Sequence, residues 1–157
     1  MNILVLAEVS ACHVTGGASR GLREQALALK QRGHNICLLV REPPADPAPT
    51  ATFDGIFEYR YHVNRSNSIA FVLSSILNSI RMFDKITTTV FQPDVVWINQ
   101  SLAAFGPIYL RYRKVKHWCY ECHSLAHEEF TTRNKPKDNL FSRTIYWLNA
   151  KMRYFVE

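Results

Sequence analysis

The sequence has 157 residues, of which 47% are hydrophobic and 20% are charged, and its formal net charge is +6. Such a chain is long enough for one domain with a substantial core, and its composition excludes intrinsic disorder. The basic residues are scattered and form no basic helix with interleaved aromatic residues, so we expect no nucleic acid as a partner. The longest apolar segment, residues 69–80, is interrupted by serine and asparagine and is too short to span a bilayer.

The chain begins directly with its first apolar run, residues 3–7, so the sequence predicts no signal peptide. Its four cysteines are then expected to be reduced thiols. Together these features predict a cytoplasmic protein without structural disulfides.

A glycine pair, Gly16-Gly17, separates this first apolar run from a helical pattern that ends at Gly33. A second apolar run, residues 36–40, follows at once. Glycines let a backbone approach a ligand closely, and a helix that begins beside them directs unbonded N–H groups and the positive end of its dipole toward the same point. The functional interpretation is a phosphate site. The alternative is a tight turn between strand and helix that binds nothing.

The later segments alternate between strand and helix patterns. Prolines between residues 43 and 49 predict an irregular loop, and residues 56–63 alternate as a third strand. Asn67 is expected to cap a long helix whose apolar stripe contains Ile69, Val72, Ile76, Ile80, Phe83 and Ile86. The remaining expected elements are a strand at 95–98, a helix at 102–113, a strand at 116–123 and a helix at 140–155.

Strands that alternate with helices predict an α/β fold, namely a doubly wound, Rossmann-like parallel sheet with helices on both faces. Right-handed crossovers bring the loops that follow such strands to one edge of the sheet, where ligands bind. We therefore expect three loops to converge there: residues 8–18, 99–102 and 123–136.

Residues 1–40 resemble the opening of the retaining glycosyltransferases of family 4, which have the two-domain B-type fold. The family's Gly-Gly-Ala-Glu-Arg element recurs at residues 16–20, with Ser19 in place of the acidic residue, and its Arg-Gly-His turn recurs at residues 32–34. In that family the glycine pair lies over the diphosphate of the nucleotide sugar. The resemblance thus implies that Gly16 and Gly17 bind the donor phosphate and that Arg20 lines the cleft.

The resemblance continues along the chain. Residues 93–96 are similar to the family's Pro-Asp-Val-Val segment, but Trp97 and Asn99 stand where the family often has His-x-His, so Asn99 is expected only to line the cleft. The strand ending at His123 resembles the family's strand ending in His-Asp. This implies that His123 is the catalytic residue facing the acceptor and the transferred sugar, while Ser124 replaces the aspartate in the cleft.

The resemblance implies that residues 1–157 are one Rossmann-like domain, the N-terminal half of a two-domain enzyme, without the C-terminal donor domain. The implied reaction is a hexosyltransferase-like transfer from a nucleotide-diphosphate sugar to a saccharide or lipid-linked acceptor in cell-envelope polysaccharide synthesis, without metal or cofactor. We expect this chain alone to be inactive and to bind donor weakly. A non-catalytic binding or scaffold domain of the same fold is the alternative.

Two further motif matches are weaker. Residues 15–22 read like the fingerprint of NAD(P)-binding short-chain dehydrogenases, and Tyr112 and Lys116 have the spacing of that family's catalytic pair. However, Arg23 replaces the closing glycine, and Lys116 enters an expected strand, whereas the catalytic pair needs one helical face.

Four side chains, Cys119, Cys122, His123 and His127, are numerically enough for zinc, and the first three match a haem-attachment sequence. Alternation along a strand would place Cys119 and Cys122 on opposite faces, so we expect no metal and interpret Cys37 and Cys119 as small core residues.

A membrane contact is a further hypothesis. Phe71, Leu73 and Leu77 widen the apolar stripe of the long helix beyond what a core needs. Basic residues are dense in the same part of the chain: Arg60, Arg65, Arg81, Lys85, Arg111, Arg113, Lys114 and Lys116. They predict either a solvated basic surface or a peripheral contact with anionic lipid at the inner face of the membrane. The solvated surface is slightly favoured, because the sequence does not place these residues on one face.

Overall fold

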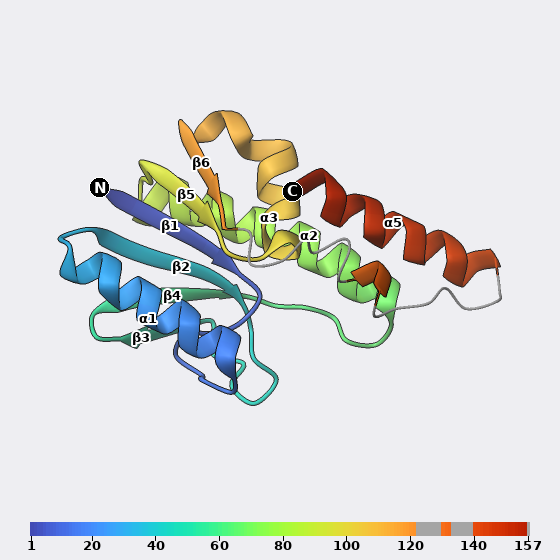
Figure 1. The fold of residues 1–157 in the computed structure, drawn as a ribbon, viewed down its shortest axis with the longest axis horizontal. Helices are drawn as coiled ribbons and strands as arrows, with labels where there is room; N and C mark the ends of the chain where they lie inside the picture. Colours follow the sequence, from blue (N-terminus) through green and yellow to red (C-terminus); the bar gives the residue numbers. More distant parts are fainter. Residues whose placement is uncertain (122–129, 133–139, 157) are drawn as a thin grey trace.

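The computed structural model describes residues 1–121, 130–132 and 140–156 (Figure 1). In this part of the chain a six-stranded sheet has the strand order β3-β4-β2-β1-β5-β6. The bounds of the strands are Asn2–Ala7 for β1, Asn35–Arg41 for β2, Thr50–Phe53 for β3, Ile56–Tyr61 for β4, Val95–Ile98 for β5 and His117–Tyr120 for β6. All neighbouring strands run parallel except β3, which pairs with β4 in antiparallel orientation.

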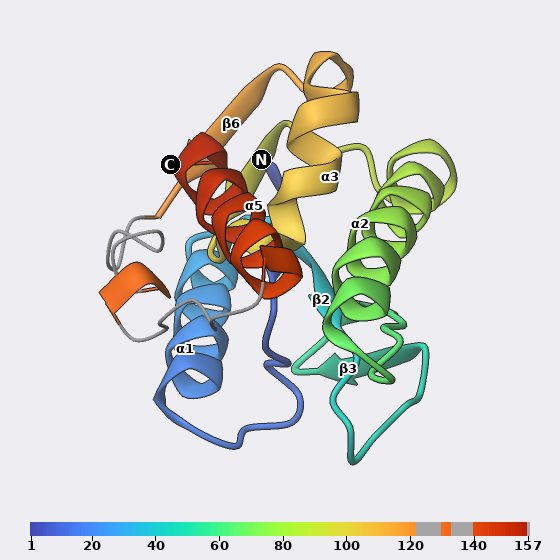
Figure 2. The same ribbon diagram turned by 90° about the vertical axis from the view of Figure 1, so that its right-hand side faces the viewer.

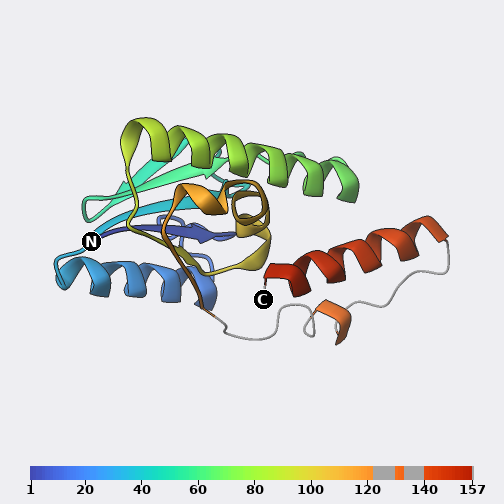
Figure 3. The ribbon, with the colours of Figure 1, turned by 90° about the horizontal axis from the view of Figure 1, so that it is seen from above.

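Helices lie on both faces of the sheet. Helix α1 (Gly17–Gln31) covers one face, and α2 (Ser68–Lys85) lies on the opposite face (Figure 3). Helix α3 (Ser101–Arg111) packs against α2, and α5 (Leu140–Val156) packs against α3 (Figure 2). A π-helical turn (Ile86–Val90) follows α2, and a 3₁₀ turn (Tyr112–Lys114) follows α3. The predicted doubly wound α/β fold is therefore confirmed.

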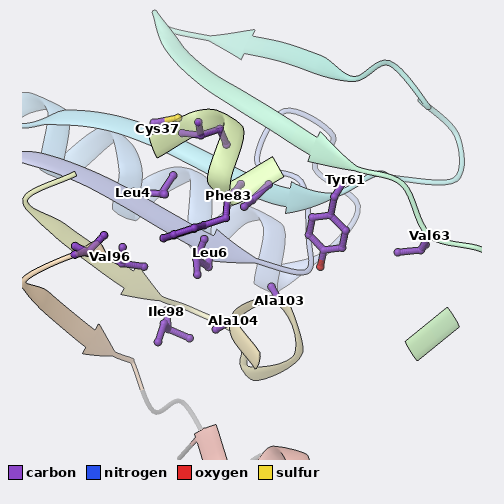
Figure 4. Packing of buried hydrophobic residues seen from close by; sticks show 13 residues of the cluster. Leu4, Leu6, Cys37, Tyr61, Val63, Phe83, Val96, Ile98, Ala103 and Ala104 are labelled. Atoms are coloured by element: carbon purple, nitrogen blue, oxygen red, sulfur yellow. The ribbon is translucent and has the colours of Figure 1, made fainter. Parts of the chain in front are cut away.

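Strand β1 is buried on both faces because its side chains alternate between two cores. Leu4 and Leu6 belong to the core beneath α2 and α3, together with Phe83, Val96 and other residues (Figure 4). Val5 and its neighbours on the other face pack toward α1. A strand covered on both sides must be apolar throughout, which explains the continuous run at residues 3–7.

The hairpin of β3 and β4 corrects the expectation of an all-parallel sheet. The two strands are joined by Asp54 and Gly55, which both have positive φ angles of 48° and 72°. An Asp-Gly pair with this conformation is typical of a tight hairpin turn between antiparallel strands. The β3 strand was missed because it is only four residues long and follows a proline-rich loop.

The helix predicted to begin after Asn67 is confirmed, since Asn67 Oδ1 accepts a hydrogen bond of 2.8 Å from the N–H of Ala70. Its predicted stripe is partly wrong, because Ile69 is exposed while Ser75 and Ser79 are buried. Both buried hydroxyls donate to backbone carbonyls of their own helix, which satisfies them in an apolar environment.

Helix α3 packs closely against α2 at Gly106. A Cβ atom on Gly106 of α3 would lie 2.7 Å from Ile80 Cγ1 and 3.0 Å from the carbonyl oxygen of Ile76. Helices that approach so closely have no space for large side chains along their contact line. Gly106 therefore allows α3 to approach α2 closely at Ile76 and Ile80.

Two predicted boundaries are also corrected at the other end of the sheet. Strand β6 ends at Tyr120 rather than at His123, and Glu121 is not part of it. Strand β4 ends at Tyr61 rather than at Val63.

Candidate functional site

The loops after β1 and β5 meet at the carboxyl edge of the sheet, as expected. The backbone N–H of Glu8 donates a hydrogen bond to Gln100 Oε1, which joins the two loops directly. The third expected loop begins at His123. Both His123 and Ser124 lie outside the described residues, as do Cys122 and His127.

The glycine turn at the start of α1 is exposed, and neither its backbone nor its packing requires glycine. Gly16 has φ of −172° and ψ of −173°, an extended conformation that any residue adopts. A Cβ atom added to Gly16 or Gly17 would meet nothing within 4 Å. The space above these two residues is therefore open to a ligand.

Ser19 fixes this turn, although it replaces the acidic residue of the family element. Its buried Oγ accepts hydrogen bonds from the N–H groups of Thr15 (3.0 Å) and Gly16 (3.1 Å) and donates to the carbonyl of Gly16 (2.9 Å). The N–H groups in the first turn of a helix have no acceptor within the helix. In the described part of the chain, no side chain or loop carbonyl accepts a hydrogen bond from Gly17 or Ala18. These N–H groups and the helix dipole form an anion-binding geometry.

Asn99 lies at the same edge of the sheet, directly after β5. Its side chain is buried, and Nδ2 lies 3.0 Å from Glu121 Oε2, to which it donates. Gln25 Nε2 donates to the other oxygen of the same carboxylate at 2.6 Å. Gln25 and Ala18 are two turns apart on one face of α1, roughly 10 Å along the helix axis. The Gln25–Glu121–Asn99 cluster therefore lies at a distance from the glycine turn.

Arg20, the remaining predicted cleft residue, is exposed on the first turns of α1. Its N–H closes the first helical turn by donating to the carbonyl of Gly16 at 3.0 Å.

A buried acidic residue that the sequence did not single out anchors the loop before the glycine turn. Glu58 of β4 is fully buried, and its carboxylate accepts hydrogen bonds from Ser10, Ala11 and Cys12. Alternation along β4 places Glu58 and Arg60 on one face, which is the only signal in the sequence that could have drawn attention to the pair.

The dehydrogenase alternative fails on geometry. Tyr112 begins the 3₁₀ turn, and Lys116 lies beyond that turn, just before β6, so the two residues do not share a helical face. Among the described residues, no group of three or more metal-ligating side chains is close enough to hold a metal ion.

The interpretation of the cysteines is confirmed for one residue and wrong for the other. Cys37 is buried in the core, whereas Cys119 is exposed. Cys119 faces an apolar hollow of about 340 Å³ beside α1, which it lines together with Ile3, Leu29 and Trp97.

The comparisons with known proteins agree with the fold described above. The sequence profile of Glycosyltransferase Family 4 matches residues 15–156, so the chain belongs to that family. Comparison with the curated proteins gave no match.

Among solved structures, sucrose-phosphate synthase from Thermosynechococcus elongatus is similar, with a TM-score of 0.63 and 14% identity. That match covers 95% of this chain and 39% of the synthase chain. A second structure of the synthase has a TM-score of 0.53 and 11% identity, with 99% of both chains covered. These likenesses support the fold.

In the described residues, no helix has the length and apolar character needed to cross a membrane.

The reactivity of the cysteines tests the conformation of the loop between β1 and α1. Burial, and then the charge of Glu58, raise the pKa of Cys12 to about 11, and burial raises the pKa of Cys37 to about 12. Because only a thiolate attacks iodoacetamide, on the order of one Cys12 thiol in a thousand is reactive at pH 8. We expect Cys119 to be alkylated much faster than Cys12, whose rate should still rise above pH 10. Peptide mapping by mass spectrometry measures both rates. Equal rates would contradict a loop that is held in place by Glu58.

Proposed function

We propose that this chain is the N-terminal, acceptor-side domain of a retaining glycosyltransferase that transfers a sugar from a nucleotide-diphosphate sugar to an acceptor. Gly16 and Gly17 lie against the donor diphosphate, and the N–H groups in the first turn of α1 meet its charge. A second domain, outside these 157 residues, supplies the other wall of the donor site. The chain spans 39% of the synthase to which it is similar, which is consistent with a longer enzyme.

The open first turn of α1 is the observation that carries the proposal. Glycines at positions where a Cβ would meet nothing are not explained by packing within the described chain. Close approach of a ligand does explain them, because a side chain there would occupy the space next to the free N–H groups. Membership of the glycosyltransferase family supports a sugar donor as that ligand.

The acceptor side of the proposal rests on the sequence resemblance. His123 faces the acceptor and the transferred sugar as the catalytic residue, and Ser124, Asn99 and Arg20 line the cleft. The proposed acceptor is a saccharide or a lipid-linked saccharide of the cell envelope, the transferred sugar is a hexose, and the reaction takes place in the cytoplasm. Neither a metal nor a cofactor takes part.

A domain that keeps this fold and binds without chemistry is the second candidate. It is favoured by the departures from the family pattern, in which Ser19 replaces the acidic residue of the glycine element and Trp97 and Asn99 stand in place of His-x-His. Sugar turnover by the full-length protein separates the two candidates.

The first test changes Gly17 in the full-length protein. Gly17→Asp places a carboxylate beside the donor phosphates, and we expect it to lower kcat/KM by about 100-fold or more. Gly17→Ala is compatible with the backbone there and should stabilise the domain by about 0.4–1 kcal/mol, since alanine loses less backbone entropy than glycine on folding. Steady-state kinetics and thermal unfolding measure the two effects.

Gly21→Asp is the matched control, because a Cβ on Gly21 also meets nothing within 4 Å but lies one helical turn farther from the N-terminus. The control should keep most of the activity. Turnover that Gly17→Asp leaves unchanged would remove the glycine turn from the mechanism.

The exposed apolar side chains of α2 support a lipid contact better than the basic residues do. Ile69, Leu73 and Leu77 follow one another at intervals of four residues along α2, and all three are exposed. By contrast, half of the basic residues named for this contact are buried or ion-paired: Arg60, Arg65, Arg111 and Lys114. Phe71 is partly buried against the core, and Arg41 stacks on its ring. We therefore propose that any peripheral membrane contact uses the exposed leucines more than charge.

Co-sedimentation of the full-length protein with anionic vesicles tests this contact. Replacing both Leu73 and Leu77 with serine should lower the partition coefficient by about 10-fold for each residue, because each buried leucine contributes about 1.5–3 kcal/mol. Phe57→Ser is the control, since Phe57 is 55% exposed but lies on β4. Absence of wild-type binding at low salt, or an equal loss in the control, would contradict the contact.

A further inference from the structure

Hydrogen bonds hold the loop between β1 and α1 to one carboxylate. Glu58 Oε1 accepts a hydrogen bond of 2.6 Å from Ser10 Oγ, and Glu58 Oε2 accepts from the N–H groups of Ala11 (2.7 Å) and Cys12 (3.1 Å). The hydroxyl of Ser10 also accepts from the N–H of His13 at 2.9 Å. The segment that leads to the glycine turn is therefore connected to the middle of β4, more than forty residues away in the sequence.

Arg60 completes this arrangement. Its side chain is 1% exposed, Nε donates to Glu58 Oε1 at 2.7 Å, and Nη1 donates to Asp46 Oδ2 at 2.6 Å. Nη2 of Arg60 lies 3.3 Å from Ser10 Oγ. Hydrogen bonding to Arg60 lowers the pKa of Asp46. The ion pair thus joins the loop after β1, the strand β4 and the loop after β2.

We infer that Glu58 is a positioning residue for the donor site. Its carboxylate holds residues 10–13 in the conformation that leads the chain to Gly16 and leaves the N–H groups of Gly17 and Ala18 open to the donor diphosphate. This inference rests on the function proposed above and adds a residue that does not touch the donor itself.

The chemistry requires a carboxylate rather than a residue of the same shape. All the groups that point at the Glu58 side chain are donors: a hydroxyl, two backbone N–H groups and a guanidinium. An ionised carboxylate accepts at both oxygens, whereas an amide must direct its NH₂ group at one set of these donors. Glu58→Gln therefore keeps the size of the side chain and breaks the contacts of at least one oxygen.

The experiment compares wild type, Glu58→Gln and Ser10→Ala in the full-length protein. Ser10→Ala keeps the buried ion pair and removes one hydrogen bond that holds the loop. It therefore remains informative if Glu58→Gln does not fold. We expect amide hydrogen exchange in residues 10–16 to be about 10-fold faster or more in both variants, since a hydrogen bond to a charged acceptor is lost. The affinity for UDP and GDP should fall, and KM for the donor should rise more than kcat falls.

Glu24→Gln is the control, because Glu24 is an exposed glutamate on α1. It should leave both the loop exchange and the nucleotide affinity at wild-type values. Unchanged exchange in residues 10–16, or unchanged nucleotide affinity in both test variants, would overturn the inference. If the wild-type protein binds neither UDP nor GDP, the proposed function fails, whereas wild-type binding that both variants retain contradicts the positioning role alone.

Discussion

The buried ion pair between Glu58 and Arg60 is the interaction on which the carboxyl edge of the sheet depends. Removing two charges from water costs several kcal/mol for each ion, and this cost is offset only where further hydrogen bonds surround the pair. Here the loop after β1 and Asp46 provide those hydrogen bonds. Three segments that are distant in the sequence must therefore be in place together. The glycine turn takes its position from this requirement.

Much of the fold could be predicted from the sequence because the signals are local. Residues 3–7 and 36–40 form strands that are buried on both faces, and such strands are recognisable as continuous apolar runs. The cap at Asn67 depends on a side chain and an N–H group only three residues apart. The glycine turn was also found in this way, since its sequence pattern and its conformation lie within one short segment.

The features that were missed depend on contacts between distant residues. The buried face of α2 depends on packing against other elements, among them α3 and β4, so periodicity alone indicated Ile69 instead of Ser75 and Ser79. Glu58 looked like an ordinary polar position of an alternating strand because its partners come from the loop after β1. The assignments of His123 and Ser124 stay predictions, since both residues lie outside the described part of the chain.

The central claim is that the first turn of α1 binds the donor diphosphate. The most direct measurement is a titration of the ¹⁵N-labelled 157-residue chain with UDP, followed through its amide resonances, because this method detects weak binding by a single wall of a cleft. We predict that the amide signals of Gly17 and Ala18 shift the most and that the signal of Gly21 shifts only weakly. Saturable shifts confined to another part of the chain, with Gly17 and Ala18 unchanged, would contradict it.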